Sequence, residues 1–350
     1  MNREAAGKIR GFIKERSRSV LFGGCALEMY LILDYVRSGG RGRPTRKPRM
    51  IQIEPTRKCN LSCSMCLRRT DGSDSSMSFE FFREIISRDF DYRHFLLLYG
   101  QGEPFLAGDL FKMIRYERSR GNFVTTVTNG TIMDDDIIGE IVRSDLNMLR
   151  ISLDGAGERT YNAVRRDADF NRVMSNIERL AGSMNEHRAR PALALTFMAM
   201  KENYRDMPAM VRIASRLGID YLEIKDLPPY ADSPVKPLSV EMTEDADIRD
   251  DIEGTVRAMK EEAKKSGVHL IMTKFHCLAG TGDCMNPWFK TFVTWDGKVK
   301  VCSKLFAASV PAMGDLGEMT FDEIWTGPRY EAVRAKTKRG IVPFEECRIV

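Results

Sequence analysis

Short apolar runs alternate with stretches of helical pattern from about residue 50 onward. Strands that alternate with helices in this way form right-handed βαβ units and a parallel sheet. The predicted strands are MIQIEP from Met50, HFLLLYG from His94, FVTTVT from Phe123, NMLRISLD from Asn147, ALALTFMAM from Ala192 and YLEIKDL from Tyr221. The predicted helices are Phe79–Ser87, Asp109–Ser119, Asp135–Arg143, Phe170–Ser183 and Tyr204–Leu217.

Six such units are too few for a complete eight-stranded barrel, so the pattern predicts an α/β fold with an open, partial (β/α)6 parallel barrel. In folds of this kind the chemistry lies at the C-terminal ends of the strands. Further along, FVTWDGKVKV (292–301) alternates apolar and polar residues around Asp296-Gly297, which predicts a β-hairpin. We expect three units: an N-terminal arm (1–45), the barrel (46–230) and a small C-terminal domain (231–350).

The charge of the chain is concentrated in the arm. The 350 residues are 43% hydrophobic, enough for a large core, and their net charge is +5. The first 50 residues hold 12 Lys and Arg against 4 Asp and Glu, so the rest of the chain is slightly acidic. This distribution argues against nucleic-acid binding by the part of the chain that follows the arm.

The arm contains an apolar segment, Ser19–Val36, that is interrupted by Glu28 and Asp34. It has too few uninterrupted apolar residues to span a bilayer, and it lacks the small-residue cleavage site of a secretory signal. We interpret it as a helix packed on the main domain. The alternative is a basic amphipathic helix that touches a membrane surface or an acidic partner. Arg37–Arg49, rich in Gly and Pro, then reads as a linker.

Eight cysteines in a chain of this length do not reach the density of a disulfide scaffold. Without an export signal we expect a reducing, cytoplasmic setting, with peripheral membrane contact as the alternative, and clustered cysteines as metal ligands. Cys59, Cys63 and Cys66 directly follow the first predicted strand, at the rim where a barrel places its chemistry. Three thiolates on a 4Fe–4S cluster would leave one iron open to an external ligand. A zinc site would need a nearby histidine, and His94 lies at the wrong end of its strand.

This CxxxCxxC loop resembles that of the radical S-adenosylmethionine (SAM) enzymes, and the resemblance extends over about residues 50–230. It implies that Cys59, Cys63 and Cys66 hold a 4Fe–4S cluster whose open iron chelates SAM. An electron from a flavodoxin- or ferredoxin-type donor then cleaves the sulfonium bond and releases a 5′-deoxyadenosyl radical. The family usually has an aromatic residue where this chain has Met65, a polarisable side chain that can pack against adenine.

The same resemblance implies a set of SAM contacts on the barrel rim. GQGEP (100–104) resembles the family's GGEP motif, with Gln101 in place of its first glycine. A carboxylate there would accept a hydrogen bond from the SAM ammonium group. Taken alone, an Asn or Asp at such positions is more often a turn or cap residue. The implied contacts are Gly102, Glu103, Asn129 in VTNGT, Ser152 and Asp154 in SLDG, and Arg165, with Arg166 as its alternative.

The C-terminal cysteines resemble the SPASM/twitch extension of radical SAM enzymes. Twelve residues separate Cys284 from Gly297 and four separate Gly297 from Cys302. The resemblance implies a small α+β iron–sulfur domain with one auxiliary 4Fe–4S cluster, because Cys347 is followed by only three residues and a second cluster would lack ligands. A four-cysteine zinc ribbon and a His276 ligand are the alternatives. The implied auxiliary ligands are Cys277, Cys284, Cys302 and Cys347.

From these parts we expect a radical SAM oxidoreductase that abstracts a substrate hydrogen atom for a net oxidation or oxidative bond formation. Within the class, the alternatives are a redox-neutral epimerase, in which Cys25 could return a hydrogen atom, and a peptide-modifying maturase. A small-molecule or lipid substrate is favoured over a peptide, because only about 45 residues precede the barrel. Asp226 and Tyr230 are candidate general bases on the rim. The different-class alternative, a non-catalytic metal-binding or electron-transfer protein, would have no use for Glu103.

Overall fold

The computed structural model describes residues 47–68, 75–185, 191–227, 235–240, 243–273, 284, 286–303 and 310–344. The predicted arm lies outside these residues. So do five residues singled out from the sequence: Cys25, Tyr230, His276, Cys277 and Cys347.

The described residues form one sheet of ten strands in the order β10-β9-β8-β1-β2-β3-β4-β5-β6-β7. Strands β1 to β7 run parallel to one another, β8 joins the other side of β1 in parallel, and β9 and β10 continue antiparallel. The strands are β1 (Met50–Ile53), β2 (Phe95–Leu98), β3 (Phe123–Thr128), β4 (Met148–Ser152), β5 (Ala192–Ala199), β6 (Tyr221–Asp226), β7 (His269–Thr273), β8 (Lys290–Val293), β9 (Lys298–Lys300) and β10 (Gly314–Asp315). The six predicted strands are all present, and the partial parallel barrel is confirmed; β7 and β10 were not predicted.

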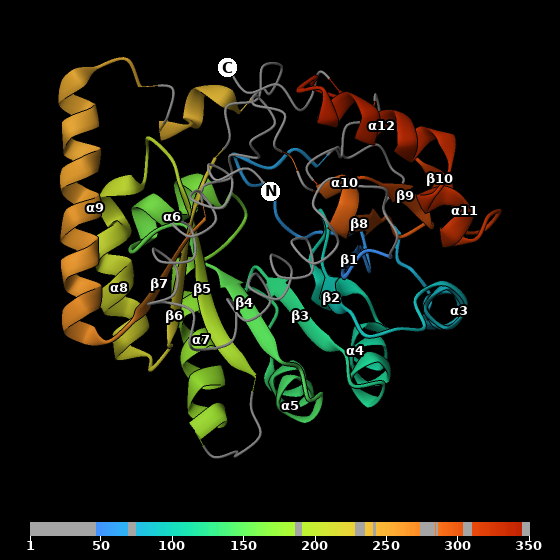
Figure 1. Ribbon diagram of the computed structural model, residues 1–350. Helices are drawn as coiled ribbons and strands as arrows, with labels where there is room; N and C mark the ends of the chain where they lie inside the picture. Colours follow the sequence, from blue (N-terminus) through green and yellow to red (C-terminus); the bar gives the residue numbers. More distant parts are fainter. Residues whose placement is uncertain are drawn as a thin grey trace.

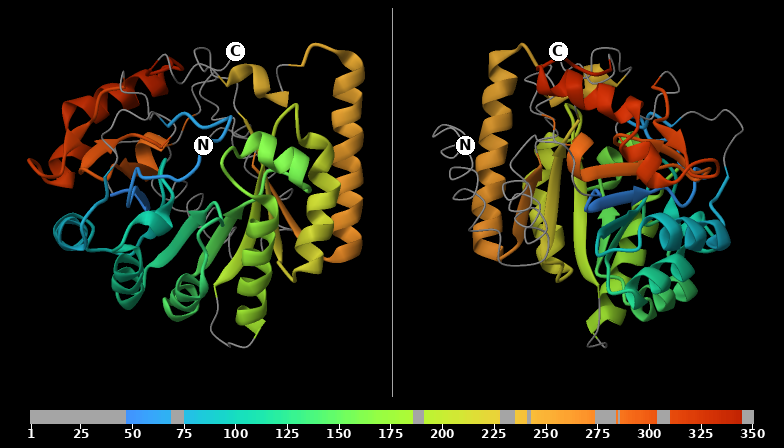
Figure 2. Two further views of the ribbon diagram at one scale, coloured as in Figure 1. Left: turned by 180° about the vertical axis from the view of Figure 1, so that it is seen from behind. Right: turned by 45° about the vertical axis from the view of Figure 1, so that its right-hand side comes forward.

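Most helices stand along the outer face of the curved sheet (Figures 1 and 2). The five predicted helices occur, the last as a 3₁₀ turn followed by α8, and the described residues also contain α6, the long α9, α10, α11 and α12. The helices are α3 (Phe79–Asp89), α4 (Leu110–Ser119), α5 (Asp135–Arg143), α6 (Glu158–Val164), α7 (Phe170–Asn185), α8 (Met207–Arg216), α9 (Ala246–Ser266), α10 (Asn286–Phe289), α11 (Phe321–Trp325) and α12 (Pro328–Lys338). The 3₁₀ turns are η1 (Pro104–Leu106), η2 (Tyr204–Asp206) and η3 (Lys236–Leu238).

Side-chain caps explain where several of these helices begin. Asp134 accepts a hydrogen bond from the Ile137 amide at the start of α5, and Asp245 accepts from the first amides of α9. Thr320 forms a capping box with Glu323 at the start of α11. Each cap satisfies amides that the first helical turn leaves without a partner.

The two faces of the sheet differ because side chains alternate along a strand. Leu149 and Ile151 of β4 belong to the main apolar core shared with the outer helices. Arg150 and Ser152, between and after them, face the opposite, concave side, which we call the barrel interior. At the N-terminal ends of the strands this interior is lined by aromatic rings, with the rings of Phe95 and Phe123 5.6 Å apart.

The predicted hairpin is present and is built directly onto the barrel sheet. β8 pairs with β1 from Met50↔Lys290 to Ile53↔Val293, and Gly297 takes a left-handed φ of 85° in the turn before β9. Core residues of α11 and α12 belong to the same apolar cluster as those of β1. The boundary between the barrel and the C-terminal domain therefore stays a prediction.

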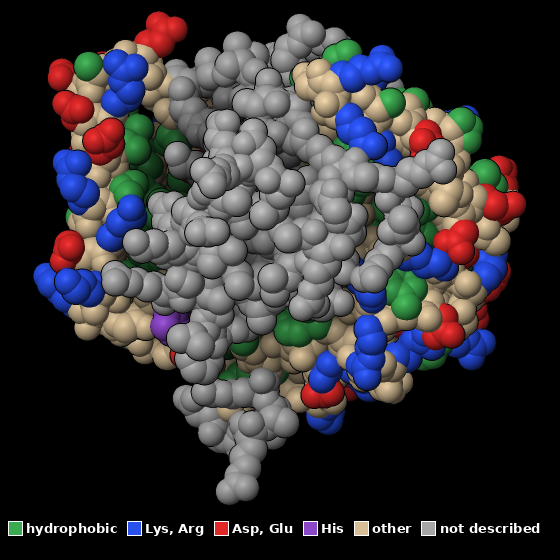
Figure 3. All heavy atoms as spheres, viewed as in Figure 1, with side chains coloured by type: hydrophobic (Ala, Val, Ile, Leu, Met, Phe, Trp, Pro, Cys, Tyr) green, Lys and Arg blue, Asp and Glu red, His purple; other side chains and the backbone are tan. Residues whose placement is uncertain are grey.

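Charged side chains of both signs line the outer edge of the molecule along α9 (Figure 3). Among the helices that the structure describes, none is long and apolar enough to cross a membrane.

Candidate functional site

The three-cysteine loop follows β1 at the C-terminal edge of the sheet. The Ser64 amide donates to the Val164 carbonyl (2.9 Å), and the Cys66 amide donates to the Cys63 carbonyl (3.1 Å). The first bond ties the loop to the end of α6, so two segments about 100 residues apart in the chain meet here. Cys59 and Cys63 are partly buried, whereas Cys66 is exposed.

Burial raises the pKa of the Cys63 thiol to about 11, with the nearby Arg165 guanidinium acting in the opposite direction. Burial likewise raises the pKa of Cys59. Both groups are therefore protonated thiols at neutral pH until a metal replaces the protons. Within the described residues, no three Cys, His, Asp or Glu side chains converge closely enough to bind a single metal ion. A cubane takes one thiolate at each iron and so suits a more widely spread set.

The loop after β2 packs directly on the cysteine loop. A Cβ at Gly102 would lie 2.3 Å from the Thr56 carbonyl oxygen and 2.7 Å from that of Lys58, so only glycine fits. The next amide, of Glu103, donates to the same Lys58 carbonyl (2.8 Å). Gly102 therefore allows the backbone proximity that the motif implies.

Glu103 lies at the centre of a buried hydrogen-bond network. Its Oε1 accepts from the Thr128 hydroxyl (2.9 Å) and its Oε2 from the Asn129 amide (2.7 Å). The Asn129 side chain in turn donates to Asn60 Oδ1 in the cysteine loop (3.0 Å). Burial raises the pKa of Glu103 to about 7 against these hydrogen bonds. Asn129 thus joins the end of β3 to the cysteine loop.

Asp154 and Arg165 form a buried ion pair beside Cys63. Arg165 Nε and Nη2 each lie 2.7 Å from Asp154 Oδ2, and Asp154 Oδ1 accepts from the Met198 amide (2.6 Å). Burial raises the pKa values of Cys63 and Glu103, and the Arg165 guanidinium opposes that rise at both groups. Arg166, the alternative to Arg165, is exposed.

The remaining predicted contacts lie around the same rim. Ser152 ends β4, two residues before Asp154 and on the same face. Met65 packs against a small apolar cluster that includes Val164 and Leu227, at the ends of α6 and β6. The structure therefore places the predicted SAM contacts at the C-terminal ends of the first four strands of the barrel.

Two residues at this rim were missed by sequence reasoning. Tyr161 is completely buried, and its hydroxyl has no hydrogen-bond partner among the described residues. Asp154, Arg165 and Cys63 all influence its pKa, which burial raises. The sequence offered only its place four residues before Arg165. Such an orphaned hydroxyl is typical of a site that completes its hydrogen bonds with a bound polar group.

Glu54 is the second missed residue, at the end of β1. Its carboxylate accepts hydrogen bonds from the amides of Gln101, in the loop after β2, and of Trp295, in the hairpin turn. Burial raises the pKa of Glu54 to about 7. An acidic residue directly after an apolar strand was the signal available in the sequence.

Comparison with protein families identifies the chain. The model of the radical SAM superfamily matches residues 53–214, and the model of the SPASM iron-sulfur cluster-binding domain matches residues 284–348. Together these stretches take up more than half of the chain. The protein belongs to the radical SAM superfamily. It is an enzyme of that family with a SPASM domain, so 4Fe–4S clusters and SAM are its cofactors.

Three known proteins are similar to this radical SAM enzyme over most of its chain. The tungsten-containing aldehyde ferredoxin oxidoreductase cofactor-modifying protein of Pyrococcus furiosus is 22% identical over 312 residues, covering 84% of this chain and 85% of the relative. The AdoMet-dependent heme synthase of Methanosarcina barkeri is 26% identical over 309 residues, covering 80% and 83%. Streptococcus suis SuiB, solved with S-adenosylmethionine, has the same fold with a TM-score of 0.67 at 14% identity, covering 94% of this chain and 78% of SuiB.

The predicted auxiliary ligands are only partly described in this radical SAM enzyme. Cys284 is partly buried and precedes α10, and Cys302 is buried two residues after the end of β9. Burial raises the pKa of Tyr330 in α12, and Cys302 lies close enough to add to that rise. The other two, Cys277 and Cys347, lie outside the described residues. The candidate base Asp226 ends β6 and is half-buried.

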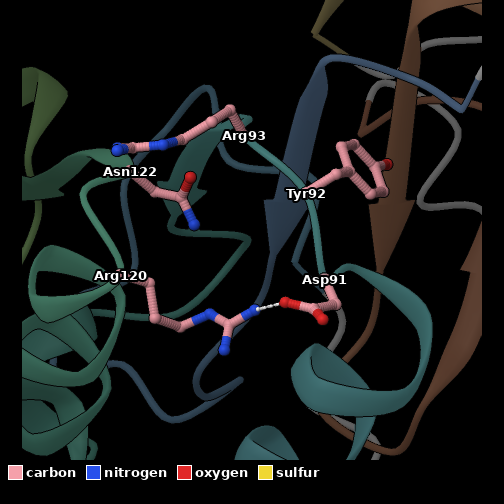
Figure 4. A pocket seen from close by; sticks show the side chains of 5 residues that line it. All are labelled: Asp91, Tyr92, Arg93, Arg120 and Asn122. Atoms are coloured by element: carbon pink, nitrogen blue, oxygen red, sulfur yellow. Dashed lines mark hydrogen bonds and ion pairs between the residues drawn. The ribbon is translucent and has the colours of Figure 1, made fainter.

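A pocket of about 320 Å³ lies at the opposite edge of the sheet, at the N-terminal ends of β2 and β3 (Figure 4). Its Arg120 forms an ion pair with Asp91. Close by, His94 Nε2 lies 2.9 Å from Glu117 Oε2 in the buried interior. None of the predicted site residues lines this pocket, and the N-terminal face of a barrel more often serves stability than chemistry.

Proposed function

We propose that this radical SAM enzyme cleaves SAM reductively at the Cys59–Cys63–Cys66 loop and abstracts a hydrogen atom from a small organic substrate in a net oxidation or oxidative bond formation. The observation that carries the proposal is the packing of three segments on one rim. The cysteine loop is held by Glu103 and Asn129 on one side and by the end of α6, with Arg165, on the other. An electron-transfer protein would not need this set of polar groups around its cluster.

Each rim residue has a role that its geometry supports. The three thiolates would hold the 4Fe–4S cluster, which supplies the electron that cleaves the sulfonium bond when SAM is bound. Glu103 is held so that its carboxylate can accept from the SAM ammonium group. Arg165, fixed by Asp154, would bind the SAM carboxylate, and Ser152 and the unpartnered Tyr161 hydroxyl would complete its polar contacts. Gly102 lets the loop after β2 lie against the backbone of the cysteine loop. Met65 would offer an apolar surface to the adenine of SAM.

The SPASM domain supports an oxidative outcome. We propose that Cys277, Cys284, Cys302 and Cys347 hold one auxiliary 4Fe–4S cluster with four thiolates. A fully ligated cluster has no open iron for substrate, which favours electron transfer as its task. A flavodoxin- or ferredoxin-type protein would deliver the electron for SAM cleavage. A net oxidation also needs a group that takes the substrate proton, and Asp226 on the rim is a candidate for it.

Two relatives that match most of this chain support a small-molecule substrate, because their names refer to cofactor modification and heme synthesis. A peptide substrate is the second candidate, since SuiB was also solved with its precursor peptide SuiA on the same fold.

Support for a lipid substrate comes from the basic N-terminal arm alone. Removing residues 1–45 should abolish binding to anionic liposomes if the arm contacts membranes, and unchanged binding would contradict that contact.

Iron analysis tests the proposed sites. The anaerobically reconstituted wild type should bind about eight irons, and a Cys59/Cys63/Cys66→Ala variant about four. SAM should perturb the EPR signal of the reduced cluster in the wild type only, and only the wild type should release 5′-deoxyadenosine. A variant that retains no iron would contradict the auxiliary cluster, and a wild type that does not cleave SAM would contradict the function.

A further inference from the structure

A charged network lies in the barrel interior, outside the proposed SAM contacts. Arg150 of β4 and Lys225 of β6 share one carboxylate: Arg150 Nε lies 3.3 Å and Lys225 Nζ 3.2 Å from Glu223 Oε2. The Thr196 hydroxyl donates to the same oxygen (3.2 Å). Arg150 Nη1 donates to the hydroxyl of Thr125 on β3 (2.6 Å). The guanidinium is thus held in one orientation from two sides.

Strand register places this network directly below the SAM contacts. Ser152 pairs with Thr196 and Thr196 with Glu223, so these three residues form one row across the interior face. Arg150 lies two residues before Ser152 on the same face. Burial lowers the pKa of Lys225, and the nearby carboxylates of Glu223 and Asp154 oppose that fall. A substrate in the barrel would therefore touch both sets of residues.

Polar atoms in this network remain available to a ligand. Among the described residues, none forms a hydrogen bond with Nη2 of Arg150 or with the hydroxyl of Tyr99. Tyr99 follows β2 on the interior face, and Arg150 and Glu223 both act on its pKa, which burial raises. The Arg150 side chain is 20% exposed and that of Lys225 17% exposed, so the network borders open space instead of being sealed in the core.

We propose that Arg150 and Tyr99 bind a carboxylate group of the substrate in the barrel interior. A guanidinium Nη2 and a phenol hydroxyl are both donors, and a carboxylate offers two acceptor oxygens for them. The proposal deepens the proposed function, on which it rests in placing the substrate inside the barrel, and it identifies the substrate class as carboxylic acids.

Simple carboxylates serve as probes because the natural substrate is unidentified. Propionate and benzoate should bind the reconstituted protein in calorimetry at constant ionic strength, whereas their neutral amides should bind at least tenfold more weakly. Arg150→Gln should weaken carboxylate binding at least tenfold, and Tyr99→Phe by a smaller factor, because the guanidinium is charged and the phenol is neutral. Arg143→Gln, which alters an exposed arginine on α5, is the matched control and should bind like the wild type.

A double variant separates binding from folding. If Arg150 only neutralises Glu223, then Arg150→Gln with Glu223→Gln should restore both stability and carboxylate binding, which would overturn the proposal. We expect it to restore stability alone. Tighter binding of inorganic phosphate than of either carboxylate would also overturn the assignment. Cleavage of SAM by the wild type is measured separately, so that its absence would contradict the proposed function while the binding data still decide the carboxylate site.

Discussion

Gly102 is the point at which the loop after β2 touches the backbone of the cysteine loop. The atoms that a Cβ would meet are carbonyl groups of Thr56 and Lys58, which cannot rotate away as a side chain could. Separation of the two loops would also break the hydrogen bond from the Glu103 amide to Lys58. The position of Glu103 relative to the cysteines therefore depends on one missing methyl group.

Gly102→Ala should lower the free energy of unfolding by about 1–3 kcal/mol, the usual range for overpacking, and should weaken SAM binding at least tenfold. Urea unfolding and calorimetry with SAM are the measurements. Gly108→Ala is the matched control, because a Cβ there would meet nothing within 4 Å. Equal behaviour of the two variants would contradict the packing argument.

Glu54 is the residue at which three segments meet. Its carboxylate accepts from the loop after β2 and from the hairpin turn, while its own amide donates to the Val293 carbonyl of β8 (2.9 Å). Burial raises its pKa from 4.5 to about 7. Between those two values the folded protein holds a proton that the unfolded chain has lost, so Glu54 makes unfolding easier as the pH rises through this window.

Glu54→Gln should remove this pH dependence. We compare the metal-free variant with the metal-free wild type at pH 5.5 and at pH 7.5. The unfolding free energy of the variant minus that of the wild type should be about 2 kcal/mol larger at the higher pH, because each unit of pKa shift corresponds to about 1.4 kcal/mol. Urea unfolding at both pH values measures the change. Glu261→Gln, an exposed position on α9, should show no such gain. A difference between wild type and Glu54→Gln that does not vary with pH would refute the assignment.

Among the helices, α10, α11 and α12 are held together by one buried arginine of α12. Arg334 Nε donates to the Pro287 carbonyl of α10 (3.0 Å) and Nη1 to the Trp325 carbonyl of α11 (2.7 Å). The guanidinium also lies 4.4 Å from the Trp325 ring centre. Burial lowers the pKa of Arg334 to about 10, which leaves it charged at neutral pH. These short helices have little stability of their own, so they depend on this contact.

Arg334→Met should lower the free energy of unfolding by about 2–4 kcal/mol, because it leaves two buried carbonyl groups without donors. Guanidinium unfolding measures it, and iron analysis should show the loss of auxiliary iron before that of the three-cysteine cluster. Arg329→Met in the same helix is the matched control: Arg329 is exposed and donates to the Ala312 carbonyl, and its loss should cost under about 1 kcal/mol. Similar costs for both variants would be evidence against the role of Arg334.

Taken as a whole, the described part of the chain has one main apolar core. Phe321 and Trp325 of α11 belong to the same cluster as Ile51 and Ile53 of β1. The strand β8 pairs with the outer edge of β1. Without the C-terminal part, β1 would become an exposed edge strand and the core would lose its cover there.

A chain that ends at residue 283 should therefore fail to fold cooperatively and should aggregate. Size-exclusion chromatography and thermal unfolding followed by circular dichroism provide the measurement, with the full chain as the control. A monomer with a sharp unfolding transition would instead show that the barrel folds alone, as the predicted boundary near residue 230 requires.

The sequence by itself determined the features that depend on local order. Short apolar runs identified the six strands, and the helical pattern identified the helices between them. The placement of Cys59, Cys63 and Cys66 directly after the first strand put them on the barrel rim, because the C-terminal ends of parallel strands share one edge. The hairpin followed from Asp296-Gly297, since a residue with positive φ is needed in such a turn.

Only the tertiary structure decided which side chains lack partners and which charges meet. The Tyr161 hydroxyl, which has no hydrogen-bond partner within the described part of the chain, and the raised pKa of Glu54 both depend on burial by segments far away in the sequence. The grouping of Arg150 with Glu223 depends on the register of β4, β5 and β6, and a shift of one residue would turn these side chains to the other face. The pairing of β8 with β1 likewise joins strands more than 230 residues apart, which no local pattern encodes.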